Sequence, residues 1–182
     1  MAVSAAEWLV LAWRLPTGGS TDRVWIWRTL RRLGAARLTP GAAALPFSEE
    51  NQEQLDWLAG EVDRHGGDAW VLPVLALSGE EARRVRDQIN QERTAEYSEL
   101  RDDALSFLGR AEHPGPDDAF VDRLRADKEL LALQRRFQKI RARDHFAAEG
   151  RAETARVIDR CLRFRQGISR KLQPVTDPHP SA

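Results

Sequence analysis

Two groups of basic side chains are the part of this sequence best suited to chemistry, and the chemistry they suit is the binding of anions. The first group consists of Arg23, Arg28, Arg31 and Arg32. The second group lies toward the end of the chain and consists of Arg135, Arg136, Lys139, Arg141, Arg143, Arg156, Arg160 and Arg163. Guanidinium and ammonium groups contact the phosphate oxygens of nucleic acids. Both groups are therefore candidate nucleic-acid-binding residues, with duplex DNA as the expected partner.

The distribution of charge supports the second group more than the first. The whole chain carries 28 Lys+Arg and 28 Asp+Glu and has no formal net charge. Residues 1–108 hold 12 basic and 17 acidic side chains, whereas residues 109–182 hold 16 and 11. Within residues 119–172, basic side chains outnumber acidic ones by 15 to 7. Such segregation is typical of a chain whose basic part meets an anionic partner.

Both groups also have a plainer interpretation, which leaves a second function open. Arginines on the surface of helices often only pair with nearby carboxylates, as Glu153 and Arg156 would do one turn apart. On that interpretation the protein is an interaction or dimerisation module that binds no nucleic acid.

Catalytic and metal-binding chemistry find little support. No histidine has metal-ligand spacing to another histidine or to a cysteine; the four are His65, His113, His145 and His179. Cys161 is the single cysteine, so no intramolecular disulfide forms, and we expect it to be a buried small hydrophobe. We therefore predict no catalytic residue, no metal and no cofactor. One segment, 16–21, has a Gly-Gly pair ahead of a helix and is a candidate site for a small oxyanion such as chromate or sulfate.

The first half of the chain predicts alternating strands and helices. The expected elements are a strand at 8–15, a helix at 23–33, strands at 35–38 and 42–45, a helix at 48–65 and a strand at 69–77. Thr21 or Asp22 caps the first helix, Gly34 ends it in a left-handed conformation, and Ser48 begins the second. Pro73 favours an edge position for the last strand. This order predicts a ferredoxin-like βαββαβ domain at 5–78.

The rest of the chain predicts three long helices, so the fold class is α+β. A connecting helix at 79–108 has sparse apolar contacts at Val85, Ile89, Leu100, Leu105 and Leu108. A linker at 109–118 leads to a basic helical hairpin at 118–172, with helices at 118–148 and 152–172, and residues 173–182 form a disordered tail. The apolar seams of the hairpin are Ala126, Leu130, Leu133, Phe137 and Ile140 in one helix and Val157, Cys161, Phe164, Ile168 and Leu172 in the other.

The apolar surfaces predict a homodimer, through a sheet edge or a helical seam. Tryptophans are expected in the core or at that interface. Trp25 is the exception, because the apolar stripe of its helix is Val24, Trp27, Leu30 and Leu33, which leaves Trp25 exposed or at an interface. The apolar run at 8–15 is too short to span a bilayer, so we expect a cytoplasmic protein without a membrane partner.

Several short blocks, in the same order, resemble a bacterial family. They are WLVLAWRLPT at 8–17, RVWIWRTLRRLGA at 23–35, GAAALP at 41–46, WVLPVLAL at 70–77 and RTAEYSEL at 93–100. Over about residues 8–150 the chain resembles the N-terminal domain of the ChrB family, regulators associated with chromate-resistance operons. The resemblance implies a cytoplasmic DNA-binding protein of the chromate or oxidative-stress response. The usual regulator carries a further C-terminal domain with no counterpart here, so direct chromate sensing is not expected of these residues.

A more distant likeness runs to the ferredoxin-like module of PaaX-type repressors and of the small dimeric CRISPR adaptation protein. Nucleases built on that module have an aspartate at the end of the first strand, where oxygen ligands hold a divalent metal. Arg14 stands at that position here, and a guanidinium does not ligate a metal. A metal-dependent nuclease is therefore the least favoured function, and we predict a non-catalytic regulatory or accessory protein.

Overall fold

The computed structural model describes residues 7–16, 20–112 and 119–171 of the chain. They pack as two compact units. The sheet unit comprises the chain up to Thr94 together with Arg141–Glu149, and the helical unit comprises Ala95–Ile140 and the chain from Gly150 onward.

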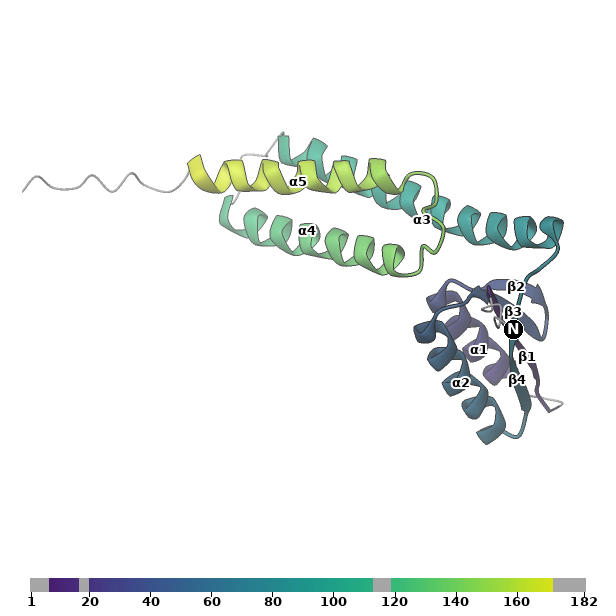
Figure 1. The fold of residues 1–182 in the computed structure, drawn as a ribbon. Coiled ribbons are helices and arrows are strands. Elements are labelled where there is room, and N and C mark those ends of the chain that lie inside the picture. The colour runs from purple at the N-terminus through teal and green to yellow at the C-terminus, as the bar shows by residue number, and fades with distance from the viewer. Residues whose placement is uncertain (1–6, 17–19, 113–118, 172–182) are drawn as a thin grey trace, which may run out of the picture. The chain divides into compact units, whose positions relative to one another are not determined.

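The sheet unit is built on a four-stranded antiparallel sheet in the order β2-β3-β1-β4 (Figure 1). Its elements are β1 (Trp8–Arg14), α1 (Ser20–Leu33), β2 (Ala36–Thr39), β3 (Ala42–Pro46), α2 (Glu49–Arg64), β4 (Asp68–Val74) and the first part of α3 (Gly79–Glu112). The predicted β-α-β-β-α-β order is confirmed, and the predicted strand and helix bounds agree within a few residues.

One face of the sheet packs on α1 and α2, and that layer holds the main core. Alternation along β1 sends Leu9 and Leu11 into it, where both are fully buried. Ile26 and Leu30 meet them from α1. The expected α1 stripe was thus partly wrong: Val24 is 49% exposed and Ile26 takes its place. Contacts with the sheet and with α2 set the rotation of the helix, and periodicity alone did not fix it.

The tryptophans divide between core and surface. Trp13 is buried, as predicted, and Trp8 is buried as well, whereas Trp57 and Trp70 are exposed, so that only the interface alternative remains a prediction for these two. Trp25 is partly buried, because its ring meets Trp57 edge-to-face at 6.1 Å and stacks on His65 at 5.9 Å. Trp25 is therefore not fully exposed, and its expected place at an interface stays a prediction.

The opposite face of the sheet is covered by α3 and by Arg141–Glu149. Trp8 is buried there with Val85 and Ile89 of α3. Phe146 packs on Trp8 with ring centroids 5.9 Å apart, and the Arg86 guanidinium lies over both rings. Aromatic burial thus fixes a segment from late in the chain onto the N-terminal strand.

Helix ends in the sheet unit follow the expected chemistry, with one correction. Ser48 accepts a hydrogen bond from the backbone N–H of Asn51 at 3.0 Å and caps α2. Gly34 ends α1 at φ 78°, as predicted. The helix begins at Ser20, so Thr21 and Asp22 lie in its first turn and do not cap it. Asp22 Oδ1 lies 3.0 Å from His65 Nδ1 instead.

The helical unit contains the second part of α3, α4 (Ala119–Ala142) and α5 (Arg151–Lys171) (Figure 1). Its buried side chains include the predicted seam of α4, in which Leu130, Leu133, Phe137 and Ile140 are buried. Residues that the sequence did not single out complete it, namely Tyr97, Ala104, Phe107 and Ile158. Leu105, expected as a contact, is 45% exposed, and Ile158 is buried where Val157 was expected, because the helices meet at a different rotation.

Two predicted helix boundaries were wrong. The first four residues of the expected linker, 109–112, belong to α3, and 113–118 lie outside the described residues, as does the predicted tail. The helix expected at 118–148 ends at Ala142. Beyond it, Asp144 Oδ1 accepts a hydrogen bond from the N–H of Ala148 at 2.9 Å, and Ala147 adopts φ 54°, so the backbone leaves the helix.

Candidate nucleic-acid interface

The arginines of α1 form an exposed basic face. Arg23, Arg28, Arg31 and Arg32 are all exposed. Among the described residues, no carboxylate lies within ion-pair distance of Arg23, Arg28 or Arg31. Arg32 donates a hydrogen bond to Thr29 Oγ1 at 3.0 Å, which orients its guanidinium, and no carboxylate in the described part of the chain pairs with it. Pairing of these side chains with carboxylates is therefore not seen among the described residues, and their exposure fits a solvated helix face as well as an anion-binding one.

The segment that follows α4 brings one member of the second basic group, Arg143, to the end of α1. His145 Nε2 donates to the carbonyl oxygen of Leu33 at 2.9 Å. The backbone of Arg143 lies against Gly34, and Arg141, in the last turn of α4, precedes Arg143 by two residues. Arg31 is in the last turn of α1, where its carbonyl accepts a hydrogen bond from Gly34.

We call Arg31, Arg32, Arg141 and Arg143 the α1-end cluster. The sequence treated its two halves as separate sites, because they are far apart in the chain. Arg37, exposed on β2 just beyond Gly34, is a basic residue that sequence reasoning missed; its guanidinium lies 5.0 Å from the Trp27 ring centroid. In the sequence, the signal that could have identified Arg37 was its position directly after the predicted end of the helix.

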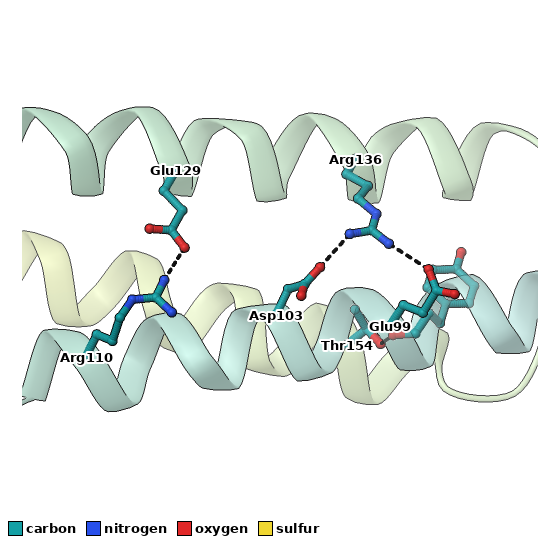
Figure 2. Close-up of polar contacts among 7 residues, drawn as sticks. Glu99, Asp103, Arg110, Glu129, Arg136 and Thr154 are labelled. Carbon is teal, nitrogen blue, oxygen red and sulfur yellow. Dashed lines mark hydrogen bonds and ion pairs between the residues drawn. The ribbon is translucent and has the colours of Figure 1, made fainter.

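Other members of the second group are used to hold the helical unit together. Arg136 on α4 binds two carboxylates of α3, Asp103 at 2.5 Å and Glu99 at 3.0 Å (Figure 2). In the other direction, Arg110 of α3 pairs with Glu129 of α4. Arg163 pairs with Asp159 at 2.8 Å within α5. Asp103 and Glu99 lie outside residues 119–172, so they offset part of the positive excess of that region, whereas Glu129 and Asp159 are already counted in it.

Two further ion pairs tie α5 to its neighbours. Arg165 binds Asp127 of α4 with two contacts of 2.6 Å, and Arg101 of α3 binds Glu153 at 3.1 Å. Glu153 therefore pairs across helices, and the intrahelical pair with Arg156 that the sequence suggested does not form. The carboxylate of Glu153 also raises the pKa of Arg101.

The remaining predicted residues are exposed on separate helices. Arg135 and Lys139 lie on α4, and no carboxylate of the described residues pairs with them. Arg156 and Arg160 lie on α5 and are exposed as well.

Arg14 ends β1, as predicted, and binds Asp68 of β4 at 2.6 Å. In the part of the chain that the structure describes, no group of three or more His, Cys, Asp or Glu side chains is placed to hold a metal ion. None of the described helices is long and apolar enough to cross a membrane. Of the segment 16–21 proposed for an oxyanion, residues 17–19, which include its Gly-Gly pair, lie outside the described residues.

Comparison with known proteins gives the family. A model of the family described as "Protein ChrB, N-terminal" matches residues 23–173, most of the chain. The chain belongs to the ChrB N-terminal family. A protein named "Protein ChrB" from Cupriavidus metallidurans is 35% identical to it over 92 residues. The match covers 50% of this chain but 28% of that protein, so the chain spans only part of its relative's length. No solved structure matches.

Proposed function

We propose that this member of the ChrB N-terminal family is a cytoplasmic, non-catalytic regulatory or accessory protein of chromate resistance that binds duplex DNA. The observation that carries the proposal is the contrast between two arginine sets. The arginines of α1 have no carboxylate partner among the described residues, whereas Arg136 and Arg163 of the helical unit are neutralised by acids. The binding surface is therefore the exposed face of α1 together with the α1-end cluster.

The geometry of α1 suits contacts with phosphates. A helix of 14 residues is about 21 Å long. About six phosphates of one DNA strand occupy that length, measured along the axis of the duplex. Arg28 and Arg31 lie one turn apart on it, as do Arg28 and Arg32. Contacts of this kind fix the position of a protein on DNA and carry no sequence information by themselves.

We also propose that the sheet unit is a ferredoxin-like module. β1 lies between β3 and β4, the neighbouring strands are antiparallel, and α1 and α2 connect strands over one face. This arrangement leaves α1 on the outside of a rigid layer, and that layer would present its arginines as a fixed surface.

Fluorescence anisotropy with labelled duplex DNA over a range of ionic strength tests the proposal. Binding should weaken steeply with salt, with a slope of log affinity against log salt of about −4, because about four phosphates release counterions. No binding at low ionic strength would remove the DNA-binding function.

A protein-interaction module is then the second candidate. Trp70 and Leu72, exposed on the edge strand β4, are the observation that favours it. For the chromate-resistance role, the expected result is that loss of the protein lowers the survival of its host on chromate.

A further inference from the structure

A groove between α1 and α2 carries chemistry that the basic face alone does not explain. It is an open cavity of about 500 Å³ lined by Thr29, Arg32, Leu33, Gln54 and Trp57. Small-ligand sites typically have volumes of about 300–1,000 Å³. The walls are rigid, because the two helices that form them bury Leu30 and Leu55 in the core beneath.

Trp57 offers an aromatic surface whose orientation is fixed. Its side chain is 49% exposed, so one part of the indole is open to solvent. The ring meets Trp25 edge-to-face at 6.1 Å, and Trp25 in turn stacks on His65 with an angle of 11° between the rings. An indole held in this way can stack a planar ring at low cost in conformational entropy.

Two polar side chains share the groove with Trp57. Arg32 uses one nitrogen to donate to the buried Thr29 hydroxyl, and no carboxylate among the described residues neutralises it. Its other N–H groups can therefore bind an anion. Gln54, which is exposed, has both a donor and an acceptor and can read the edge of a base.

We propose that this groove binds a nucleotide with an unstacked base, the base lying on Trp57 and a phosphate at Arg32. The inference rests on the proposed nucleic-acid binding and deepens it. Leu33 lines the groove, and its carbonyl oxygen accepts the hydrogen bond from His145, so the groove lies beside the α1-end cluster. A single-stranded segment and a free nucleotide share this chemistry, and the test separates them.

The test measures anisotropy of a labelled single-stranded oligonucleotide and of the matching duplex with the full chain. Trp57→Leu should weaken single-strand binding about tenfold or more, because stacking contributes about 1–3 kcal/mol per base. It should leave duplex binding within about twofold of wild type, since phosphate contacts remain. Trp70→Leu is the matched control, because Trp70 is exposed to a similar degree but lies on β4. Arg32→Ala is a second variant if Trp57→Leu lowers the melting temperature.

The outcomes are distinct. Competition by an unlabelled mononucleotide assigns the groove to a free nucleotide, whereas Trp57-dependent binding without such competition assigns it to a single strand. If Trp57→Leu and Arg32→Ala both bind single strands as well as Trp70→Leu does, the groove assignment is overturned. The proposed function is still intact in that case if the wild-type protein binds duplex DNA. If the wild-type protein does not bind the duplex but binds single strands in a way that depends on Trp57, only the proposal of duplex binding is overturned.

Discussion

Gly34 lies directly against Arg143, although more than half of the chain separates them in sequence. A Cβ atom at Gly34 would stand 2.6 Å from the carbonyl oxygen of Arg143 and 3.1 Å from its Cβ. The left-handed φ of 78° at Gly34 also excludes most side chains. This contact brings the end of α1 and the segment after α4 together, and it creates the α1-end cluster.

Gly34→Ala should destabilise the protein by about 2 kcal/mol or more. The left-handed conformation alone costs a residue with a Cβ about 1–2 kcal/mol, and the backbone of Arg143 must also move. Urea unfolding measures the change. Gly60→Ala is the matched control, because Gly60 is inside α2 and nothing lies within 4 Å of a Cβ atom built there. Alanine at this position should stabilise the protein by up to about 1 kcal/mol. Equal effects of both substitutions would contradict the close contact.

Arg136→Ala should lower the free energy of unfolding by at most about 1 kcal/mol, and less at high salt, because the ion pairs that it removes are partly exposed. Its neighbour Arg135 has no acidic partner among the described residues, so Arg135→Ala should change stability by less than about 0.5 kcal/mol. Chemical unfolding at two ionic strengths measures both. A cost for Arg136→Ala that does not depend on salt would argue against the ion pairs.

Cys161 should be inert toward thiol reagents until the protein unfolds. Its side chain is fully buried, Sγ lies 3.5 Å from the carbonyl oxygen of Ala104, and burial raises the pKa of the thiol. The unfolded state therefore loses its thiol proton first as pH rises. Stability from the neutral thiol is present below the ordinary thiol pKa and is lost progressively as pH rises toward the raised pKa.

The slope of unfolding free energy against pH above the ordinary thiol pKa measures this effect. It should be less negative for Cys161→Ala than for wild type, by at most about 1.4 kcal/mol per pH unit. Identical slopes, or rapid labelling of the folded protein, would show that the thiol is accessible.

The sheet edge at β4 should mediate a homodimer. Leu72 is 47% exposed on this edge strand. The other edge of the sheet, at β2, is covered by the side-chain amide of Gln88. The amide oxygen accepts a hydrogen bond from the backbone N–H of Arg37, and the amide nitrogen donates to the Arg37 carbonyl oxygen, at 3.1 Å each. Leu72→Arg should therefore shift the protein to monomer in analytical ultracentrifugation. Leu105→Arg, equally exposed but on α3, should not. A monomeric wild type at micromolar concentration would remove the prediction.

The sequence indicated local structure well, because local structure depends on neighbouring residues. Alternation in β1, the Ser48 cap and the Gly34 terminus are each decided within a few positions. The rotation of α1 was missed because contacts with the sheet and with the end of α2 determine it, such as the stacking of Trp25 on His65, the residue after α2. The end of α4 was missed because Phe146 packs on Trp8, a contact that no local pattern encodes.

The candidate site was harder to predict than the fold. All of the basic residues were visible in the sequence, but their partners were not. Arg136 meets Asp103 and Glu99 only because α3 and α4 pack in one register, while Arg31 meets no acid among the described residues. The net charge of the segment therefore indicated the helical unit as the DNA-binding surface. The ion pairs seen in the structure favour α1 instead.

The most direct test of the DNA-binding surface compares two double charge reversals in the salt-dependent anisotropy assay. Arg31→Glu with Arg141→Glu alters the α1-end cluster, and Arg125→Glu with Lys128→Glu makes the same change in charge on the exposed face of α4. We predict that the first pair reduces the salt slope by about two or more and weakens duplex binding at least about a hundredfold, while the second stays within about threefold of wild type. Equal losses from both pairs, or a larger loss from the α4 pair, would contradict the assignment of the surface to α1.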